Sequence, residues 1–355
     1  MAVQTIPAPA LAADPYAELA RELDALGDAV RDDLGAADAA YIHRLIALQR
    51  GLEVAGRALL VLSRWRAAQL AGTATLTLSK VLENMEIGHN VLHGQWDWMR
   101  DPQIQSATWE WDMAPTARSW RRAHNHTHHV WTNVVGRDRD LGYSAMRVDE
   151  AQPWHPVHLL QPVYGLLMAL TFEWGIALYD LELDGVRKGT RSREAAQDEL
   201  RAFVHKLSRQ VAKDFVLFPL LAGRRGRRRA LAGVLAANVL RSVWVHTIVF
   251  MGHLPDGAET FSEAQVEGET RGQWYARQLS GSCNLEGDRL FHLLTGHLSF
   301  QIEHHLFPDV PSRRLPGLAP RVREACERHG LPYLSGRLGP QWRSVAKKVV
   351  RLSLP

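Results

Sequence analysis

The stretch that decides the fold is His124-Asn125-His126-Thr127-His128-His129, in which four of six residues are histidines. On an α-helix, positions i, i+4 and i+5 share a face, so the imidazoles of His124, His128 and His129 are expected to point to one place. The side chain of His126 is expected to point elsewhere. This geometry makes the stretch a candidate for binding metal.

Two further histidine clusters offer the same chemistry. His89 and His93 lie four residues apart, and His304 and His305 are adjacent. A closed structural zinc site takes four ligands, usually with Cys among them, so seven imidazoles exceed one such site. Two metals fit the three clusters better. Imidazole suits Fe, Zn, Cu and Ni, so the spacing alone does not select the metal.

Composition excludes several classes of protein. The 355 residues suffice for two ordinary domains or one large one. Cys283 and Cys326 form no Cys-x-x-Cys spacing, which argues against a disulfide framework or thiolate site and favours a reducing compartment. The net charge of +4 suits an anionic membrane surface or substrate, and nothing indicates nucleic acid.

No dinucleotide fingerprint or Walker loop appears, so reducing power is expected from another protein.

The mean hydropathy of -0.21 favours a soluble protein when taken alone, but it hides local apolar runs. Residues 157–179 and 230–252 each contain one charge and reach the roughly 20 residues that cross a bilayer. Residues 58–62, 67–79 and 214–223 are apolar but shorter, and for the first two length alone would favour buried helices of a soluble protein.

The N-terminal residues 1–40 lack the basic start and apolar core of a signal peptide, so retention in or on the cytosolic side is expected. Pro7 and Pro9 suggest a mobile arm, and residues 16–31 have the periodicity of an amphipathic helix. The rest of the chain, residues 41–355, is expected to be one domain. It opens with helices at 41–62 and 67–86, which we interpret as a membrane hairpin that leads into His89.

A conflict surrounds the strongest apolar run, which begins after five arginines at residues 224–229 and ends at Gly252-His253. If His253 joins the other histidines, the arginines lie on the opposite side of the membrane, against the positive-inside tendency. Either His253 is no ligand, or this loop breaks the rule. The resemblance described next favours the second interpretation.

The chain resembles the membrane fatty acid desaturases from about Tyr41 to its C-terminus. The motifs that carry the resemblance are Gly88-His89-x-x-x-His93, Trp120-Arg121 with His124-Asn125-x-x-His128-His129-x-x-Thr132-Asn133, and Gln301-Ile302-Glu303-His304-His305-Leu306-x-Pro308. Further stretches are similar to the bacterial stearoyl-CoA desaturase branch, namely Asn84-Met85-Glu86-Ile87-Gly88-His89-Asn90 and Gly94-Gln95-Trp96-Asp97-Trp98. One such box would be a weak signal, whereas three in order are specific.

The resemblance implies an all-α membrane protein with four transmembrane helices in two hairpins beneath a cytosolic helical cap. The cap would hold two iron ions, with dioxygen as co-substrate. The implied metal ligands are His89, His93, His124, His128, His129, His253, Gln301, His304 and His305. An even number of crossings must separate His129 from His253, and we assign the runs at 214 and 230 as spans. The run at 157 would then lie along the interface, although pairing it with the run at 230 is an alternative.

Several further residues are candidates for supporting roles. Asn133 and Asp140 follow the central box and are expected to orient ligand imidazoles. On a helix, positions 297, 301, 304 and 305 share a face, so His297 would replace Gln301 as a ligand or hydrogen-bond to it. The alternative is that His297 is simply one polar residue in place of another and has no role at the metals. The candidate cations for the phosphates of coenzyme A are Arg121, Arg122, Arg187 and Lys188.

The function implied by the resemblance is oxygen-dependent insertion of a cis double bond, with delta-9 expected, into stearoyl-CoA or palmitoyl-CoA. Electrons would come from a ferredoxin or flavin reductase driven by NADPH, and membrane lipid would surround the chain. Membrane hydroxylases and alkane monooxygenases share the histidine boxes, but Gln301 at the start of the third box favours a desaturase. A histidine-rich metal transporter is a third reading; it would carry polar residues along a path inside its spans, whereas these histidines flank them.

Overall fold

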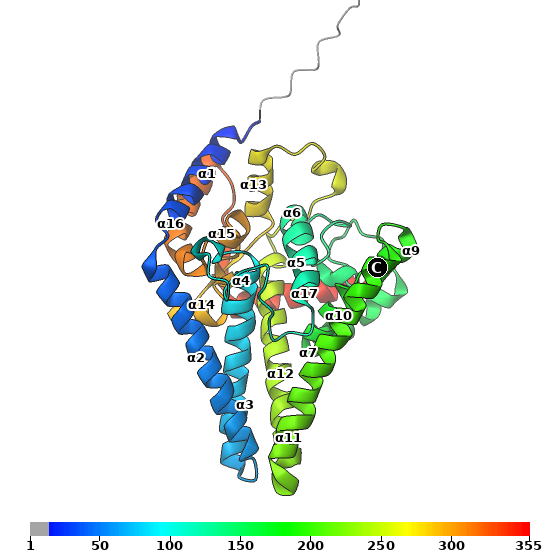
Figure 1. The fold of residues 1–355 in the computed structure, drawn as a ribbon. Coiled ribbons are helices and arrows are strands. Elements are labelled where there is room, and N and C mark those ends of the chain that lie inside the picture. Colours follow the sequence, from blue (N-terminus) through cyan, green and yellow to red (C-terminus); the bar gives the residue numbers. More distant parts are fainter. Residues whose placement is uncertain (1–13) are drawn as a thin grey trace, which may run out of the picture.

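The computed structural model describes residues 14–355, so the expected arm with Pro7 and Pro9 lies outside the described residues. Figure 1 shows a broad helical cap above a tapering stem of long helices. The prediction of an all-α fold is confirmed apart from two short parallel strands, β1 (Asn284–Glu286) and β2 (Ser335–Arg337).

The stem consists of two helical hairpins. The first joins α2 (Ala36–Val61) to α3 (Arg66–Leu82), where a hairpin was predicted. The second descends through α10 (Arg193–Val211), a π-helical segment (Ala212–Leu217) and α11 (Phe218–Leu221), and returns as α12 (Gly223–His253). α3 packs against both α2 and α12.

Glycines set the close approach of α2 to α3. A Cβ on Gly56 would lie 2.8 Å from the backbone nitrogen of Leu76, and one on Gly72 would lie 2.9 Å from that of Leu60. Any larger side chain would therefore push the two helices apart, because small residues at a helix contact let the backbones approach closely.

The apolar run at residues 157–179 does not form one straight helix. Its parts, Pro156–Leu170 and Phe172–Lys188, are bent by 97°. Within them lie a 3-10 turn (Pro156–Leu160), α7 (Gln161–Leu170), α8 (Phe172–Tyr179) and α9 (Leu183–Lys188). Within residues 14–355, α12 alone is long and apolar enough to cross a membrane, and the bent pair adds a second candidate if it is counted as one span.

The cap incorporates the N-terminal helix. The predicted amphipathic helix is α1 (Ala17–Asp32), and it packs against α13 (Arg271–Ser280) and α16 (Leu315–His329) in a shared apolar core. The predicted division at residue 40 falls inside α2, so it marks no break in the fold. The remaining α-helices are α4 (Asn90–Leu92), α5 (Ala117–Ala123), α6 (His129–Trp131), α14 (Arg289–Leu294), α15 (Gln301–Leu306) and α17 (Leu338–Ser353).

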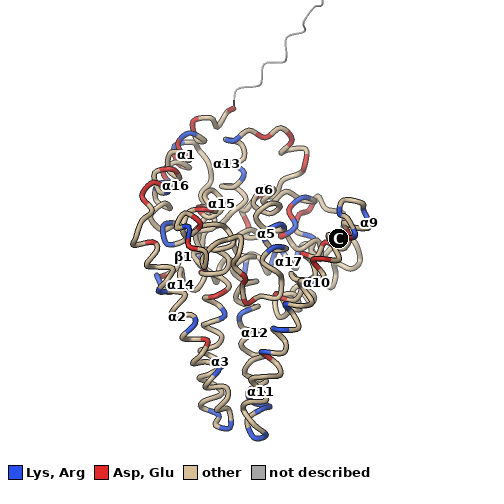
Figure 2. The backbone as a smooth tube through the Cα atoms, in the orientation of Figure 1, with Lys and Arg blue, Asp and Glu red and all other residues tan. Residues whose placement is uncertain are grey.

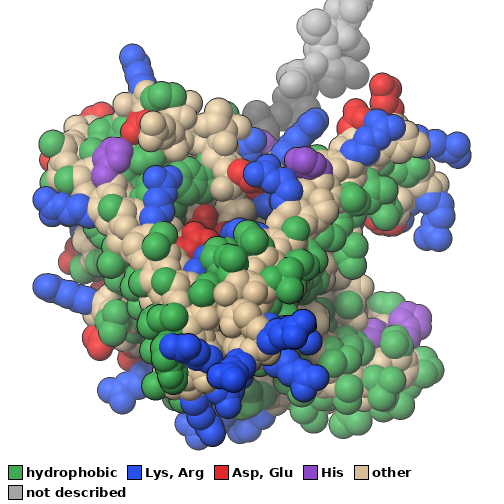
Figure 3. Space-filling view, turned by 60° about the horizontal axis from the view of Figure 1, so that its bottom comes forward, with side chains coloured by type: hydrophobic (Ala, Val, Ile, Leu, Met, Phe, Trp, Pro, Cys, Tyr) green, Lys and Arg blue, Asp and Glu red, His purple; other side chains and the backbone are tan. Residues whose placement is uncertain are grey.

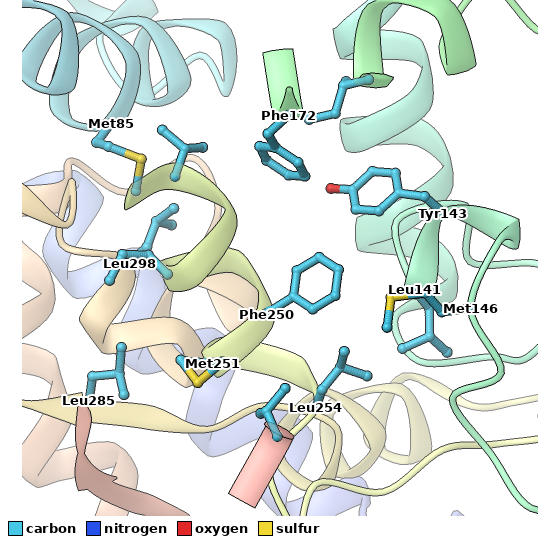
Figure 4. Packing of buried hydrophobic residues seen from close by; sticks show 14 of the residues in the cluster. Met85, Leu141, Tyr143, Met146, Phe172, Phe250, Met251, Leu254, Leu285 and Leu298 are labelled. Carbon is cyan, nitrogen blue, oxygen red and sulfur yellow. The ribbon is translucent and has the colours of Figure 1, made fainter. Parts of the chain in front are cut away.

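An apolar core fills the junction between cap and stem. Figure 4 shows Met85, Phe172, Phe250 and Leu298 in this core, all buried and drawn from segments far apart in the sequence. Tyr143 lies edge-on to Phe172, with ring centroids 5.5 Å apart. This packing fixes the upper ends of α3 and α12, which carry histidines into the cap.

Candidate metal centre

The three histidine boxes and His253 converge at the base of the cap. The first box follows α3, the second spans α5 to α6, His253 ends α12, and the third lies in α15. The side chains of the seven box histidines are buried, apart from that of His124, which is slightly exposed. His126 is exposed, as predicted.

Two of the boxes adopt π-helix rather than the expected α-helix. The segment Glu83–His89 is π-helical, and so is His124–His128. A π-turn inserts one residue into the α-helical repeat and redirects the side chains around it, and such turns are frequent at functional sites. Here the rings of His124 and His128 stack, with centroids 4.9 Å apart. The α-helical prediction therefore found the right residues but the wrong local backbone.

The candidate ligand atoms form two main groups. In each group, the ligand nitrogens lie within 4.8 Å of one another. The first group is His89, His93, His124 and His304, and the second is His128, His253 and His305. A further overlapping group joins His124 and His128 to Asp140. Two neighbouring sites match the two metals expected from the number of histidines.

His129 lies between the two groups. Its ring centroid is 4.5 Å from that of His93 in the first group and 4.3 Å from that of His305 in the second. Neither ring nitrogen of His129 has a hydrogen-bond partner among the described residues. This position allows His129 to serve either site.

Many nitrogens of the cluster are buried without a hydrogen bond inside residues 14–355. They include Nε2 of His93, Nε2 of His124 and both nitrogens of His304. Leaving one buried polar group unsatisfied costs about 1–3 kcal/mol, so several in one place call for a missing partner. Burial also lowers the pKa of His89 to about 4, which keeps that imidazole neutral and its lone pair available. The donor set therefore fits metal ions.

Carboxylates orient the second box from outside the cluster. Nδ1 of His124 lies 2.7 Å from Oδ2 of Asp140, and Nδ1 of His128 lies 2.9 Å from Oδ1 of Asp138. The Nδ1–H groups donate to these carboxylates, which leaves each Nε2 as the metal-facing acceptor. Asp138 is itself held by the backbone nitrogens of Asn133 and Asp140. The predicted orienting role of Asp140 agrees with this contact.

Two orienting amides escaped prediction from the sequence. Nδ1 of His89 lies 3.1 Å from Oδ1 of Asn90, and Nδ1 of His305 lies 3.1 Å from Oε1 of Gln278. The hydroxyl of Thr132 is 3.2 Å from the same nitrogen of His305. Asn90 adjoins a box and could have been suspected, whereas nothing in the sequence connects Gln278 with His305.

Gln301 and Asn133 both contact the end of α12. Nε2 of Gln301 lies 2.9 Å from Nε2 of His253, and Oε1 of Gln301 is buried without a partner inside the described chain. Asn133 adopts a left-handed conformation, with φ of 58°, and its side chain donates to the backbone oxygens of His253 and Gly281. The side chain of Gln301 thus faces the second group directly, whereas the side chain of Asn133 fixes the backbone of His253.

The helical-face prediction for His297 is wrong. α15 begins only at Gln301, and His297 precedes it in a left-handed conformation with φ of 55°. Its Nδ1 lies 2.8 Å from Oε2 of Glu86, and it belongs to neither histidine group. The other oxygen of Glu86 accepts from Tyr41 and Ser312. His297 therefore joins a separate polar network that connects the third box to the start of the first.

The four predicted phosphate-binding cations do not line one common pocket. The guanidinium of Arg122 contacts both carboxylate oxygens of Glu199 at 2.8 Å, so its charge is already paired. Lys188 pairs with Asp184 at 2.9 Å on the surface and lines a hollow of about 770 Å³. Arg187 is exposed and Arg121 is partly covered. Arg187 forms no ion pair within residues 14–355, and Nε of Arg121 is buried there without a partner, so neither belongs to a formed phosphate site.

A narrow cavity of about 50 Å³ adjoins the histidines. Its lining combines cluster residues such as His89, His128 and His253, the polar side chains of Asn84, Asp140, Asp180 and Gln301, and a larger set of apolar residues. The apolar lining includes Met85, Trp111, Met113, Phe172, Ile176, Val245, Val249 and Leu298. A hydrocarbon suits such a cavity, because its burial is favourable and needs no polar partner.

Comparison with known proteins decides the family. The family model named fatty acid desaturase matches residues 64–337, which include all three boxes and His253. The chain belongs to the fatty acid desaturases. It is therefore an oxidoreductase of lipid metabolism, and the resemblance seen in the sequence is confirmed.

Individual relatives agree with this assignment. The chain is 47% identical over 344 residues to the NADPH-dependent stearoyl-CoA 9-desaturase of Mycobacterium tuberculosis, covering 95% of this chain and 80% of that protein. It is 23% identical over 273 residues to the sn-1 linoleoyl-lipid 6-desaturase of Synechocystis, covering 75% of each. Bovine fatty acid desaturase 3 is 38% identical over a shorter stretch of 104 residues, 29% of this chain. These names do not favour the hydroxylase or transporter readings.

Proposed function

We propose that this desaturase is a membrane-bound, oxygen-dependent acyl-CoA desaturase with two irons that forms a cis double bond at position 9 of a saturated chain such as stearoyl-CoA. The observation that carries the proposal is the double group of buried histidines beside an apolar cavity. The name of the relative from Mycobacterium tuberculosis, at 47% identity, supports the substrate and the position of the double bond.

Each histidine group would hold one iron. His89, His93, His124 and His304 would bind the first, and His128, His253 and His305 would bind the second, with His129 between them. Iron with dioxygen would supply the high-potential oxidant that an unactivated methylene requires and that side chains cannot provide. The protein positions the alkyl chain, keeps the imidazoles neutral through burial, and orients two of them through Asp138 and Asp140.

The electrons are proposed to come from a separate protein. The relative is called NADPH-dependent, yet this chain contains no dinucleotide-binding fingerprint. The purified chain is expected to be inactive with NADPH alone and active when ferredoxin and a flavin reductase are added. Turnover by the purified chain with NADPH as its only electron source would contradict this arrangement.

We propose that four stem segments cross the membrane, namely α2, α3, the end of α10 with α11, and α12, with the metal centre on the cytosolic side. Exposed apolar side chains along both hairpins support this topology. They are Leu48, Val54, Leu62, Leu70, Leu78, Val216, Leu217, Leu220, Leu221, Leu231, Leu235 and Leu240. The 97° bend between Pro156–Leu170 and Phe172–Lys188 supports the proposal that the run at residue 157 follows the membrane interface.

Cysteine labelling tests this topology. Both native cysteines, Cys283 and Cys326, are buried, so the background should be low. In intact cells, a membrane-impermeant maleimide is expected to label Arg227→Cys in the stem tip, and to label Arg321→Cys in the cap only after lysis. Labelling of both before lysis, or of Arg321→Cys alone, would contradict the proposed orientation.

Lipid analysis of a host that lacks its own desaturase tests the function. Expression of the chain is expected to convert stearoyl groups to the 9-cis product. His304→Ala should abolish the product, whereas His126→Ala, which changes an exposed histidine of the same motif, should retain it. Hydroxylated fatty acids in place of the olefin would favour the hydroxylase reading, and a double bond at another position would correct the regiochemistry.

A further inference from the structure

Seven exposed arginines gather at the end of the stem farthest from the cap. Figure 2 marks basic residues along the backbone at this end, and Figure 3 shows basic side chains gathered on this face; we call this group the arginine tip. Its members are Arg64 and Arg66 in the first hairpin, and Arg224, Arg225, Arg227, Arg228 and Arg229 in the second.

The charge of the arginine tip is not balanced by nearby acids. No Asp or Glu occurs between Glu53 and Glu83, or between Asp214 and Asp256. Accordingly, no member of the tip forms an ion pair within residues 14–355. Arginines in the cap behave differently; Arg314, for example, pairs with two carboxylates. The tip therefore presents an uncompensated positive surface.

Local contacts join the two hairpin turns into one surface. Nη1 of Arg229 donates to the backbone oxygen of Arg64 at 2.7 Å. Gly226 allows α12 to approach the other turn, since a Cβ there would lie 3.2 Å from the backbone nitrogen of Arg64. The arginines of both turns are thus held side by side.

The surroundings of the tip match a membrane interface. Trp65 is half exposed, and the guanidinium of Arg64 lies 3.7 Å from its ring centroid. Leu62, Leu220 and Leu221 are exposed beside it. Amphipathic aromatic rings and arginines next to an apolar belt are typical of the headgroup level of a bilayer.

The length of α12 places the tip and the metal centre at opposite surfaces of a bilayer. Its 31 residues rise by about 46 Å at 1.5 Å per residue. This exceeds the roughly 30 Å of the hydrocarbon layer. His253 ends α12 in the histidine cluster, so the arginines at the other end lie beyond the far boundary. This step rests on the proposed membrane topology.

We propose that the arginine tip binds the phosphates of anionic phospholipids in the leaflet that faces away from the metal centre. Guanidinium groups match phosphate oxygens in charge and in bidentate geometry. The N-terminal end of α12 points into the same surface and adds positive potential. Lipid binding also explains why arginines persist where the positive-inside tendency would exclude them.

Reconstitution of the full chain tests this proposal. The thermal midpoint is measured in nanodiscs of phosphatidylcholine alone and of phosphatidylcholine mixed with phosphatidylglycerol. A tip variant combines Arg224→Gln, Arg225→Gln, Arg227→Gln and Arg228→Gln. A cap control removes the same charge through Arg289→Gln, Arg321→Gln, Arg343→Gln and Lys347→Gln, which are exposed positions. Native mass spectrometry counts the lipids that remain bound.

Phosphatidylglycerol is expected to raise the midpoint of the wild type and the cap control, and the tip variant should lose most of that shift. A second tip variant with Lys at the four positions should retain much of the shift, because Lys keeps the charge. High salt should weaken binding. A full shift in the Gln tip variant, an equal loss in the cap control, or an equal shift from inorganic phosphate in detergent would overturn the proposal.

Desaturase turnover of the same wild-type samples separates the two proposals. A phosphatidylglycerol shift without any desaturation would contradict the proposed function and leave lipid binding intact. Desaturation without a phosphatidylglycerol shift would refute lipid binding by the tip and leave the proposed function intact.

Discussion

The chain contains two buried polar clusters, and they differ in how their polar groups are paired. In the histidine cluster at the base of the cap, several ring nitrogens have no partner among the described residues. In the stem just below, buried side chains form an ionic network of opposite charges. Lys80 lies 2.5 Å from Asp112 and 3.1 Å from Asp214, and Arg57 lies 2.9 Å from Asp214.

The ionic network continues across the bundle through Arg241. This fully buried guanidinium contacts the carboxylate of Glu173 and the side-chain oxygen of Asn84. The Arg57–Asp214 pair lacks hydrogen-bond alignment despite its short distance, so Coulomb attraction holds it. The network supplies each buried charge with an opposite charge.

The contrast between the two clusters lies in charge rather than in hydrogen bonding, because atoms of Glu173, Arg241 and Asp214 in the ionic network also lack hydrogen-bond partners within residues 14–355. Where the chain buries charge for structure, it brings partners from α2, α3, α12 and the π-helical segment Ala212–Leu217. Where it buries imidazoles, it supplies orienting carboxylates on the outer side and leaves the inner nitrogens open. The histidine cluster therefore leaves nitrogens open for added metal ions, whereas the charges of the ionic network neutralise one another.

Removing an inner histidine should have the largest effect on the metal centre. His304→Ala is expected to lower metal content and product formation at least about 100-fold, beyond the loss typical of outer hydrogen-bond partners. Neither ring nitrogen of His304 has a hydrogen-bond partner within residues 14–355, so the substitution breaks no hydrogen bond there. Metal analysis and product assay check this result, with His126→Ala as the matched control. Full activity in His304→Ala would place the chemistry elsewhere.

Breaking the ionic network should instead affect stability. Asp214→Asn leaves Lys80 and Arg57 buried with one fewer negative partner, which is expected to lower the free energy of unfolding by about 3–5 kcal/mol. The protein that remains folded should keep its metal. Thermal unfolding in detergent, with Asp198→Asn as an exposed control, measures the loss. Unchanged stability, or metal loss without destabilisation, would contradict the assignment of the ionic network to stability and of the histidine cluster to metal binding.

A change outside the inner shell should have an intermediate effect. Asp138→Asn removes the carboxylate that holds Nδ1 of His128 and the turn at Asn133. Metal affinity is expected to fall about 10- to 100-fold, as for other outer partners of ligating histidines. Titration of metal into chelator-treated protein gives the affinity. Wild-type affinity would show that His128 needs no orienting carboxylate.

The smallest effect is expected at His297. His297→Ala leaves Oε2 of the buried Glu86 without its partner, while the other oxygen keeps Tyr41 and Ser312, so a cost of about 1–3 kcal/mol is expected. Metal content and turnover should be normal. A metal deficit in this variant, with stability unchanged, would restore His297 as a ligand.

Sequence spacing selected the histidines of the second box only in part, because residues four apart share a side of an α-helix, whereas residues five apart share one only in the wider π-turn. It could not reveal the π-turns at Glu83–His89 and His124–His128, which depend on tertiary packing. The prediction for His297 failed for a related reason. It extended the helix of the third box toward the N-terminus, whereas the left-handed backbone at His297 cannot belong to an α-helix.

Long-range pairs were also beyond prediction. Gln278 and His305 come from different helices, and Lys80 meets Asp214 only when the two hairpins pack. Trp96 and Trp111 lie in a tryptophan-rich part of the sequence, and only the fold shows that both are buried in the cap. Local periodicity describes one element at a time, so contacts between elements need the fold.

Metal stoichiometry in active, freshly purified protein tests the central claim most directly. Elemental analysis against protein concentration is expected to give two irons per chain, one for each histidine group. The same preparation must form product when electrons are supplied. Active protein with one iron or fewer per chain, or with zinc as its only metal, would contradict the account.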